Sequence, residues 1–180
     1  MPDSVSEERR KLVRHYGAEV ILMHDDGNIG DCIDRCLKKA LEMVKEGKFG
    51  DIYSVEAHMS VRHKAQKQEW LKQFKGGMMY FLGCHDIDLV VRFMGEPKKV
   101  TPFNRPTMQN GIDCEDLGFA VLEYDNGVSF VKSCAAELNG FARRQLVVVG
   151  TKGTVEIKPL EMHAPGGLYT EMRACKASDS

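Results

Sequence analysis

The stretch "LGFAVLEYDNGVSFVKSCAAEL", residues 117–138, determines the fold that we expect for this chain. Apolar residues alternate with other residues on both sides of Asn126-Gly127, and this dipeptide is a strong signal for a tight turn between antiparallel strands. The stretch "RRQLVVVGTKGTVEIKPL", residues 143–160, repeats the pattern around Thr151-Lys152-Gly153. Together they predict two consecutive β-hairpins and therefore an antiparallel meander.

The residues before these hairpins add a strand and a helix. In "DIYSVEAHMSVRH", residues 51–63, apolar residues occupy alternate positions, which is typical of a strand with one buried face. Apolar residues at helical spacing predict a helix over 85–94 that ends at Gly95. We therefore predict an α+β fold, a mostly antiparallel open sheet with helices packed on one face.

The first 47 residues predict a short helix-strand-helix segment. A capping box at Ser4 to Glu7 indicates a helix over 6–15, and the apolar run at 18–24 indicates a buried strand. Apolar residues at helical spacing then predict a second helix that ends at Gly47. The expected organisation is this segment over 1–47, followed by the main domain over 48–180.

Two other regions give weaker signals. We interpret the polar residues 64–77 as an exposed loop that turns helical near Trp70. Residues 162–180 have no clear period and are predicted to be loop or frayed.

The composition excludes several classes of protein. The 180 residues carry a net charge of −1 with both signs interspersed, which does not favour binding to nucleic acid or to a membrane. There is no apolar run of membrane-spanning length, and we expect a cytoplasmic protein. The six cysteines form no C-x-x-C pair, so we interpret them as reduced thiols and expect no metal site.

His85 is the main candidate for chemistry because imidazole can give and take a proton near neutral pH. It begins the predicted helix over 85–94, and Asp88 and Arg92 follow at spacings that place them nearby. The alternative interpretation is a plain helix start with a surface Asp88–Arg92 pair. Trp70 could stack on a sugar ring, although a lone tryptophan is also common in cores and interfaces.

Residues 44–160 resemble the substrate-binding domain of the Gfo/Idh/MocA oxidoreductases, a family that includes glucose–fructose oxidoreductase and inositol dehydrogenase. The resemblance rests on several motifs in the same order, among them "GKFGDIYSVEAHMS", "GGMMYFLGCHDIDLVVRFMGEPKKV" and "EDLGFAVLEYDNGVSFVKSCAAE". It implies hydride transfer between a nicotinamide cofactor and a secondary alcohol of a sugar or cyclitol. It also implies a homo-oligomer formed through the open face of the sheet.

The resemblance carries over to single positions. Gly76-Gly77 match the glycines before the active-site segment of the family, His85 matches its catalytic histidine, and Asp88 matches the aspartate of Gly-x-His-x-x-Asp. Many members have an acidic residue where this chain has Phe81, which cannot move a proton. Asp88, Trp70 and Lys64 are the candidates for binding substrate, Trp70 and Lys64 being the weaker ones.

The chain also departs from the family. The Gly-rich fingerprint and the Glu-Lys-Pro motif of its nucleotide-binding domain are not found in this sequence. The resemblance thus implies NAD or NADP in an intact family enzyme, but we expect neither to bind this chain alone. Residues 1–45 also resemble an internal stretch of the cysteine synthase group of pyridoxal-phosphate enzymes.

Three functions remain open from the sequence. The first is a fragment of a NAD(P)-dependent oxidoreductase, inactive by itself, with His85 beside the reacting hydroxyl of a sugar or cyclitol. The second is a non-enzymatic dimerisation or ligand-binding domain. The third is a fragment of a pyridoxal-phosphate enzyme, for which the sequence offers no cofactor lysine.

Overall fold

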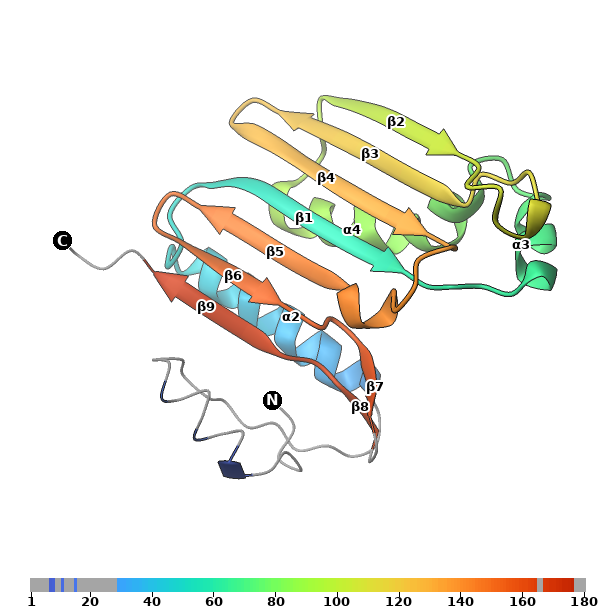
Figure 1. Cartoon of the computed structure of the whole chain (residues 1–180). Coiled ribbons are helices and arrows are strands. Elements are labelled where there is room, and N and C mark those ends of the chain that lie inside the picture. The colour runs from blue at the N-terminus through green and yellow to red at the C-terminus, as the bar shows by residue number, and fades with distance from the viewer. Residues whose placement is uncertain (1–6, 9–10, 12–14, 16–28, 165–166, 177–180) are drawn as a thin grey trace.

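A computed structural model describes residues 7–8, 11, 15, 29–164 and 167–176, and gives only the backbone for 29–32, 163–164 and 167–169. The predicted strand over 18–24 and most of the predicted helix over 6–15 lie outside these residues. The α+β class is confirmed: one sheet carries two long helices on the same face (Figure 1).

The sheet has seven strands in the order β2-β3-β4-β1-β5-β6-β9 among the described residues. In chain order the strands are β1 (Ile52–Ser60), β2 (Lys99–Arg105), β3 (Leu117–Tyr124), β4 (Gly127–Cys134), β5 (Gln145–Gly150), β6 (Gly153–Ile157) and β9 (Met172–Lys176). The two predicted hairpins are present as β3–β4 and β5–β6. The two edge strands, β2 and β9, do not pair with each other, so the sheet is open, as predicted.

The prediction of an antiparallel meander is wrong at the centre of the sheet. Strand β1 lies between the two hairpins and pairs in parallel with β4, for example His58 beside Lys132. Its other neighbour, β5, is antiparallel. Turn signals in the sequence indicate only which consecutive strands pair with each other. They do not indicate that the connection from β4 to β5 passes over the end of β1 (Figure 1). The sheet is therefore mixed, and the prediction that it is mostly antiparallel is confirmed, since the other described pairings within it are antiparallel.

The covered face of the sheet packs against α2 (Ile29–Lys45) and α4 (Cys84–Met94). Helix α2, predicted from its apolar spacing, buries Cys36, Leu37 and Ala40 against the sheet. Helix α4 buries Leu89 and Val90 in the same core cluster. From the sheet, the alternate residues of each strand complete this core, namely Val55, Ala57, Ala120, Leu122, Val131, Leu146, Val148, Val155 and Ile157.

A second, smaller core lies beyond the end of β1. Helix α3 (Ala65–Leu71) and the π-helical segment η1 (Met79–Gly83) enclose buried Leu71 and Met78. The predicted turn to helix near Trp70 is confirmed, since α3 contains Trp70. The prediction of an exposed loop is wrong for the rest of α3, which buries Gln68 and Leu71. The apolar pattern of this helix is incomplete in the sequence because one of its buried positions is Gln68, a polar residue that is hydrogen-bonded inside the protein.

The prediction of loop over 162–180 is also wrong for the three strands in this segment, and residues 177–180 lie outside the described residues. Strands β7 (Met162–Ala164) and β8 (Gly167–Tyr169) form a hairpin, and β9 pairs with β6. No apolar period is visible here because β9 is an edge strand whose residues after Met172 are all exposed. The opposite edge, β2, was missed for a similar reason and contains Pro102, which edge strands tolerate.

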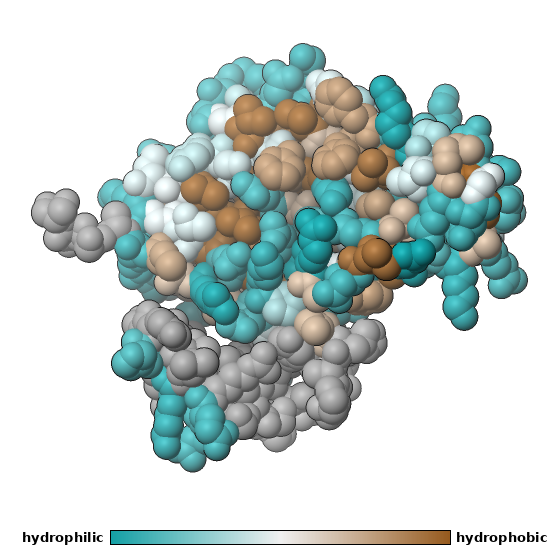
Figure 2. Space-filling view, viewed as in Figure 1, coloured by the Kyte–Doolittle hydropathy of each residue, from teal (hydrophilic) through white to brown (hydrophobic). Residues whose placement is uncertain are grey.

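The other face of the sheet is not covered by a described helix and is partly apolar (Figure 2). Phe103, Phe119 and Val121 on β2 and β3, and Val128 and Phe130 on β4, share this face by register. Phe103, Val128 and Phe130 are 48%, 50% and 41% exposed. We call these five residues the apolar sheet patch.

Candidate functional site

Helix α4 begins directly after the π-helical segment η1, and His85 is its second residue. The side chain is exposed, and it lies at the junction where the chain leaves the smaller core and enters the long helix. π-helical turns inside helices are often found at functional sites. The predicted helix start is thus confirmed within one residue.

A cavity of about 340 Å³ lies beside His85, near the lower end of the range for small-molecule sites, roughly 300–1,000 Å³. Its wall combines six apolar residues with six polar ones: Ile33, Leu37, Met59, Leu82, Leu89 and Leu160, and Asp34, His85, Asp88, Arg92, Arg144 and Glu161. Helices α2 and α4, strand β1 and the segments after η3 (Phe141–Arg143) and β6 each contribute. His85 and Asp88, predicted together, do line one cavity.

Two ion pairs lie in the wall. On α4, Nε of Arg92 donates to Oδ2 of Asp88 at 2.8 Å, one helical turn away. Across the cavity, Nη1 of Arg144 donates to Oε2 of Glu161 at 2.6 Å. No local sequence pattern indicates Arg144 and Glu161, because they reach the cavity through tertiary packing from segments far from His85 in the chain.

Asp86, next to His85 on α4, does not line this cavity. It is fully buried, and neither carboxylate oxygen has a hydrogen-bond partner among the described residues. Burial raises the pKa of Asp86 to about 8, although the backbone of Met59 and the charge of Arg144 act in the opposite direction. Asp86 therefore holds its proton at neutral pH.

Trp70 and Lys64 do not line this cavity. Trp70 lies in a separate shallow pocket with Gln66 and Lys67, and Nζ of Lys67 is 3.4 Å from the centre of a Trp70 ring. Lys64 is exposed and precedes the first residue of α3. The structure thus separates these two candidates from His85 and Asp88.

Phe81, where many family members have an acid, belongs to the aromatic cluster around Trp70. The two ring centres are 5.3 Å apart in an edge-to-face arrangement, and Phe81 packs against the smaller core. It is not among the residues that line the cavity of His85. Phe81 is therefore a packing residue of the smaller core.

Gly77 allows a close approach of backbone to backbone rather than of a ligand. A Cβ atom at this position would lie 2.2 Å from the carbonyl oxygen of Glu115, and the φ angle of Gly77 is +44°. The neighbouring N–H of Gly76 donates to Oε2 of Glu115 at 2.8 Å. Both glycines fix the segment that leads into η1 and α4.

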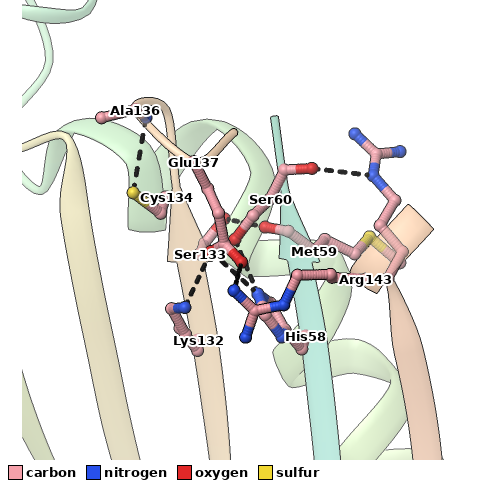
Figure 3. A network of polar contacts seen from close by, with 10 residues as sticks. His58, Met59, Ser60, Lys132, Ser133, Cys134, Ala136, Glu137 and Arg143 are labelled. Atoms are coloured by element: carbon pink, nitrogen blue, oxygen red, sulfur yellow. Dashed lines mark hydrogen bonds and ion pairs between the residues drawn. The ribbon is translucent and has the colours of Figure 1, made fainter. Parts of the chain in front are cut away.

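A second polar cluster lies at the end of β1 and β4 (Figure 3). Oε2 of Glu137 accepts from Nζ of Lys132 at 2.7 Å and lies 3.3 Å from Nε2 of His58, and Arg143 pairs with the other oxygen. Burial and the charge of Lys132 lower the pKa of His58. Burial alone would raise the pKa of Glu137, but hydrogen bonds from Lys132 and Ser60 outweigh it, and that pKa is lowered.

This cluster includes a serine, a histidine and a glutamate, but it is not arranged for nucleophilic catalysis. Oγ of Ser60 and Oε2 of Glu137 both approach the same nitrogen, Nε2 of His58, at 2.8 and 3.3 Å. A catalytic triad needs them on opposite nitrogens of the imidazole. The cluster therefore joins β1, β4 and the segment after β4.

Other classes of site find no support in the described part of the chain. No group of three or more potential metal ligands is found there, and no disulfide joins the described cysteines. None of the described helices has the length and apolarity needed to span a membrane.

The structure is thus a one-sided mixed sheet with a cavity beside the first turn of α4, where His85 lies. Residues 37–156 match the family model for the GFO/IDH/MocA C-terminal domain. The chain belongs to this family.

Relatives place the domain within longer proteins. An uncharacterized oxidoreductase from Escherichia coli K12, YhhX, is 29% identical over 122 residues, which is 67% of this chain and 34% of YhhX. The chain thus spans about a third of that relative.

Solved structures share the fold at low identity. An aldose-aldose oxidoreductase from Caulobacter crescentus, complexed with glycerol, is 20% identical with a TM-score of 0.65, over 78% of this chain and 41% of that one. A levoglucosan dehydrogenase in complex with NADH and levoglucosan is 16% identical with a TM-score of 0.62, over 82% and 42% of the two chains. At these identities the similarity establishes the fold.

Proposed function

We propose that this chain is the substrate-binding part of a NAD(P)-dependent oxidoreductase that acts on a secondary alcohol of a sugar or cyclitol. The observation that carries the proposal is that His85 and Asp88 line one cavity of suitable size. The family membership supports it, as do relatives whose structures contain NADH with levoglucosan, or glycerol. The protein acts in the cytoplasm.

In this proposal His85 exchanges the proton of the reacting hydroxyl. Its exposed imidazole borders the cavity, where a hydroxyl group can reach it. Asp88 uses Oδ2 to bind Arg92, which leaves Oδ1 to accept a hydrogen bond from a neighbouring hydroxyl. With Phe81 in place of an acid, His85 passes its proton to solvent.

The described residues do not fit a nicotinamide nucleotide. The described connection from a strand to an α-helix, residues 61–64 between β1 and α3, contains no glycine, whereas dinucleotide sites use a glycine-rich turn there. We therefore assign the cofactor to a separate nucleotide-binding domain and expect this chain alone to hold none and to be inactive.

Calorimetric titration tests the proposal. We expect the purified chain to bind glucose or myo-inositol and to show no heat with NAD or NADP. His85→Ala and Asp88→Ala each remove a hydrogen bond and should weaken polyol binding about fivefold. Lys64→Ala is the matched control outside the cavity. Micromolar nucleotide binding, or polyol binding that both substitutions leave unchanged, would refute the proposal.

We also propose that the apolar sheet patch binds a second copy of this chain. Exposed apolar patches of this kind commonly mark protein interfaces, and a two-fold axis would place the patch against itself. The cluster of Glu137, Lys132 and Arg143 lies on β4 and the segment after it, beside the patch, and would supply polar contacts at its rim. This property also fits a non-enzymatic dimerisation domain.

A further inference from the structure

The charged groups of the cavity beside His85 compensate one another. Its wall has three carboxylates, on Asp34, Asp88 and Glu161, and two guanidinium groups, on Arg92 and Arg144. With neutral histidine the formal charge of the wall is thus −1 at pH 7. Each guanidinium already has a carboxylate of the same wall as its partner.

The two pairs differ in how firmly they are held. The side chains of Arg92 and Asp88 are 51% and 57% exposed, so that pair is solvated and weak. The side chains of Arg144 and Glu161 are 8% and 27% exposed. A buried guanidinium depends on its counter-charge, and removing that partner is strongly unfavourable.

Several contacts fix Arg144 in place. Nε donates to the carbonyl oxygen of Ser60 at 3.3 Å, and the guanidinium carbon lies 3.9 Å from the ring centre of Phe141. The backbone also holds the pair together, because the N–H of Leu160, next to Glu161, donates to the carbonyl oxygen of Arg144 at 2.8 Å. The Arg144–Glu161 pair is therefore a preformed part of the cavity wall.

We propose that the Arg144–Glu161 ion pair sets the charge selectivity of this cavity and restricts it to uncharged polyols, such as neutral monosaccharides or cyclitols, against sugar acids and sugar phosphates. The inference rests on the proposed function, and it adds the class of substrate and two residues that determine it.

The physical reason is the absence of an uncompensated cation in the described wall. A carboxylate or phosphate of a ligand would have to displace Glu161 from Arg144, and it would meet the negative charges of Asp34 and Asp88. A hydroxyl group carries no such penalty, because it can donate to a carboxylate oxygen and accept from a guanidinium N–H. The apolar side chains, such as Leu89 and Leu160, can contact the C–H groups of a ring.

Parallel calorimetric titrations of the 180-residue chain with glucose, myo-inositol, glucuronate and glucose 6-phosphate test the inference. We expect each neutral ligand to bind at least tenfold more tightly than either anion. High salt screens repulsion, so raising the ionic strength should narrow this ratio by improving anion binding.

Two substitutions test the residues themselves. Glu161→Gln leaves Arg144 without a counter-charge and should improve glucuronate affinity at least tenfold relative to glucose. Asp34→Asn removes an exposed carboxylate of the wall and should improve glucuronate affinity about threefold relative to glucose. Asp125→Asn, which breaks an exposed pair with Lys98 elsewhere on the surface, is the matched control and should change neither affinity.

The outcomes separate this inference from the proposed function. Glucuronate or glucose 6-phosphate binding the unaltered chain as tightly as glucose would overturn the charge selectivity and leave a carbohydrate site in place. Binding of none of the four ligands would overturn both proposals. If Glu161→Gln does not fold, the ratio for the unaltered chain and the effect of Asp34→Asn still decide.

Discussion

Gln68 and Asp116, 48 positions apart and both fully buried, are joined by a hydrogen bond of 3.1 Å from Nε2 to Oδ2. Asp116 also accepts from the backbone N–H and the hydroxyl of Thr107, both at 2.6 Å. Oε1 of Gln68 accepts from Asn110 at 2.8 Å. This network fastens α3, and with it the segment that leads to η1 and His85, to the loop before β3.

We predict that Asp116→Ala destabilises the protein by about 3 kcal/mol. The substitution leaves the amide N–H of buried Gln68 without its acceptor, and an unsatisfied buried group costs about 1–3 kcal/mol. It also removes the two hydrogen bonds that hold exposed Thr107, each worth about 0.5–1.5 kcal/mol. Urea denaturation measures the change. The exposed neighbour Asp113→Ala is the control and should lie within about 0.5 kcal/mol of the unaltered chain. Equal effects at the two positions would contradict the role of the network.

The buried carboxyl group of Asp86 predicts a pH dependence of stability. Its pKa is raised from 3.8 to about 8, so the folded state keeps a proton that the unfolded state releases. The free energy of unfolding therefore falls as the pH rises between these two pKa values. The Asp86→Asn variant lacks this titration, so its free energy of unfolding should rise relative to that of the unaltered chain by roughly 4 kcal/mol between pH 4 and pH 8.

Urea denaturation at several pH values measures this difference. The exposed carboxyl of Asp88 provides the control, and Asp88→Asn should change stability only slightly across the same range. Parallel pH profiles for Asp86→Asn and the unaltered chain would mean that Asp86 is ionised in the folded protein.

A methyl group at Gly77 should clash with the backbone at Glu115. Gly77→Ala places Cβ 2.2 Å from a backbone carbonyl oxygen that has little room to move. We therefore predict that the free energy of unfolding falls by about 3 kcal/mol. Gly47→Ala is the matched control because Gly47 also has positive φ but no atom within 4 Å. It should cost about 1 kcal/mol. Equal losses at both glycines would show that conformation, not contact, is what matters.

The apolar sheet patch predicts an oligomer that a charge can disrupt. Phe130→Glu places a carboxylate near the middle of the patch and should turn an oligomer into a monomer. Sedimentation velocity measures the molecular mass of both forms. Tyr80→Glu, an exposed aromatic residue on η1, is the control and should leave assembly unchanged. A monomer in the unaltered chain would contradict the prediction.

The sequence predicted those parts of the fold that depend on neighbours in the chain. Asn126-Gly127 and the alternation around it identify β3 and β4, and the spacing of apolar residues identifies α2 and α4. The position of β1 between β4 and β5 was missed, because a parallel pairing involves no turn and leaves no local signal. The edge strand β9 was missed because its residues are mostly exposed.

The same distinction applies to the site. His85 and Asp88 are three residues apart on one helix, so a local pattern places them together. Arg144 and Glu161 reach the cavity from the connections after η3 and β6, and only the fold brings them to α4. Trp70 has the right chemistry to bind a sugar, but α3 carries it into another pocket.

NMR titration of the ¹⁵N-labelled chain with glucose or myo-inositol shows whether the cavity beside His85 binds the polyol. We expect the amide signals of residues 82–92, Arg144 and Glu161 to shift with a common binding curve, while those of Gln66 and Trp70 stay in place. Shifts confined to Gln66 and Trp70, or to the apolar sheet patch, would contradict it.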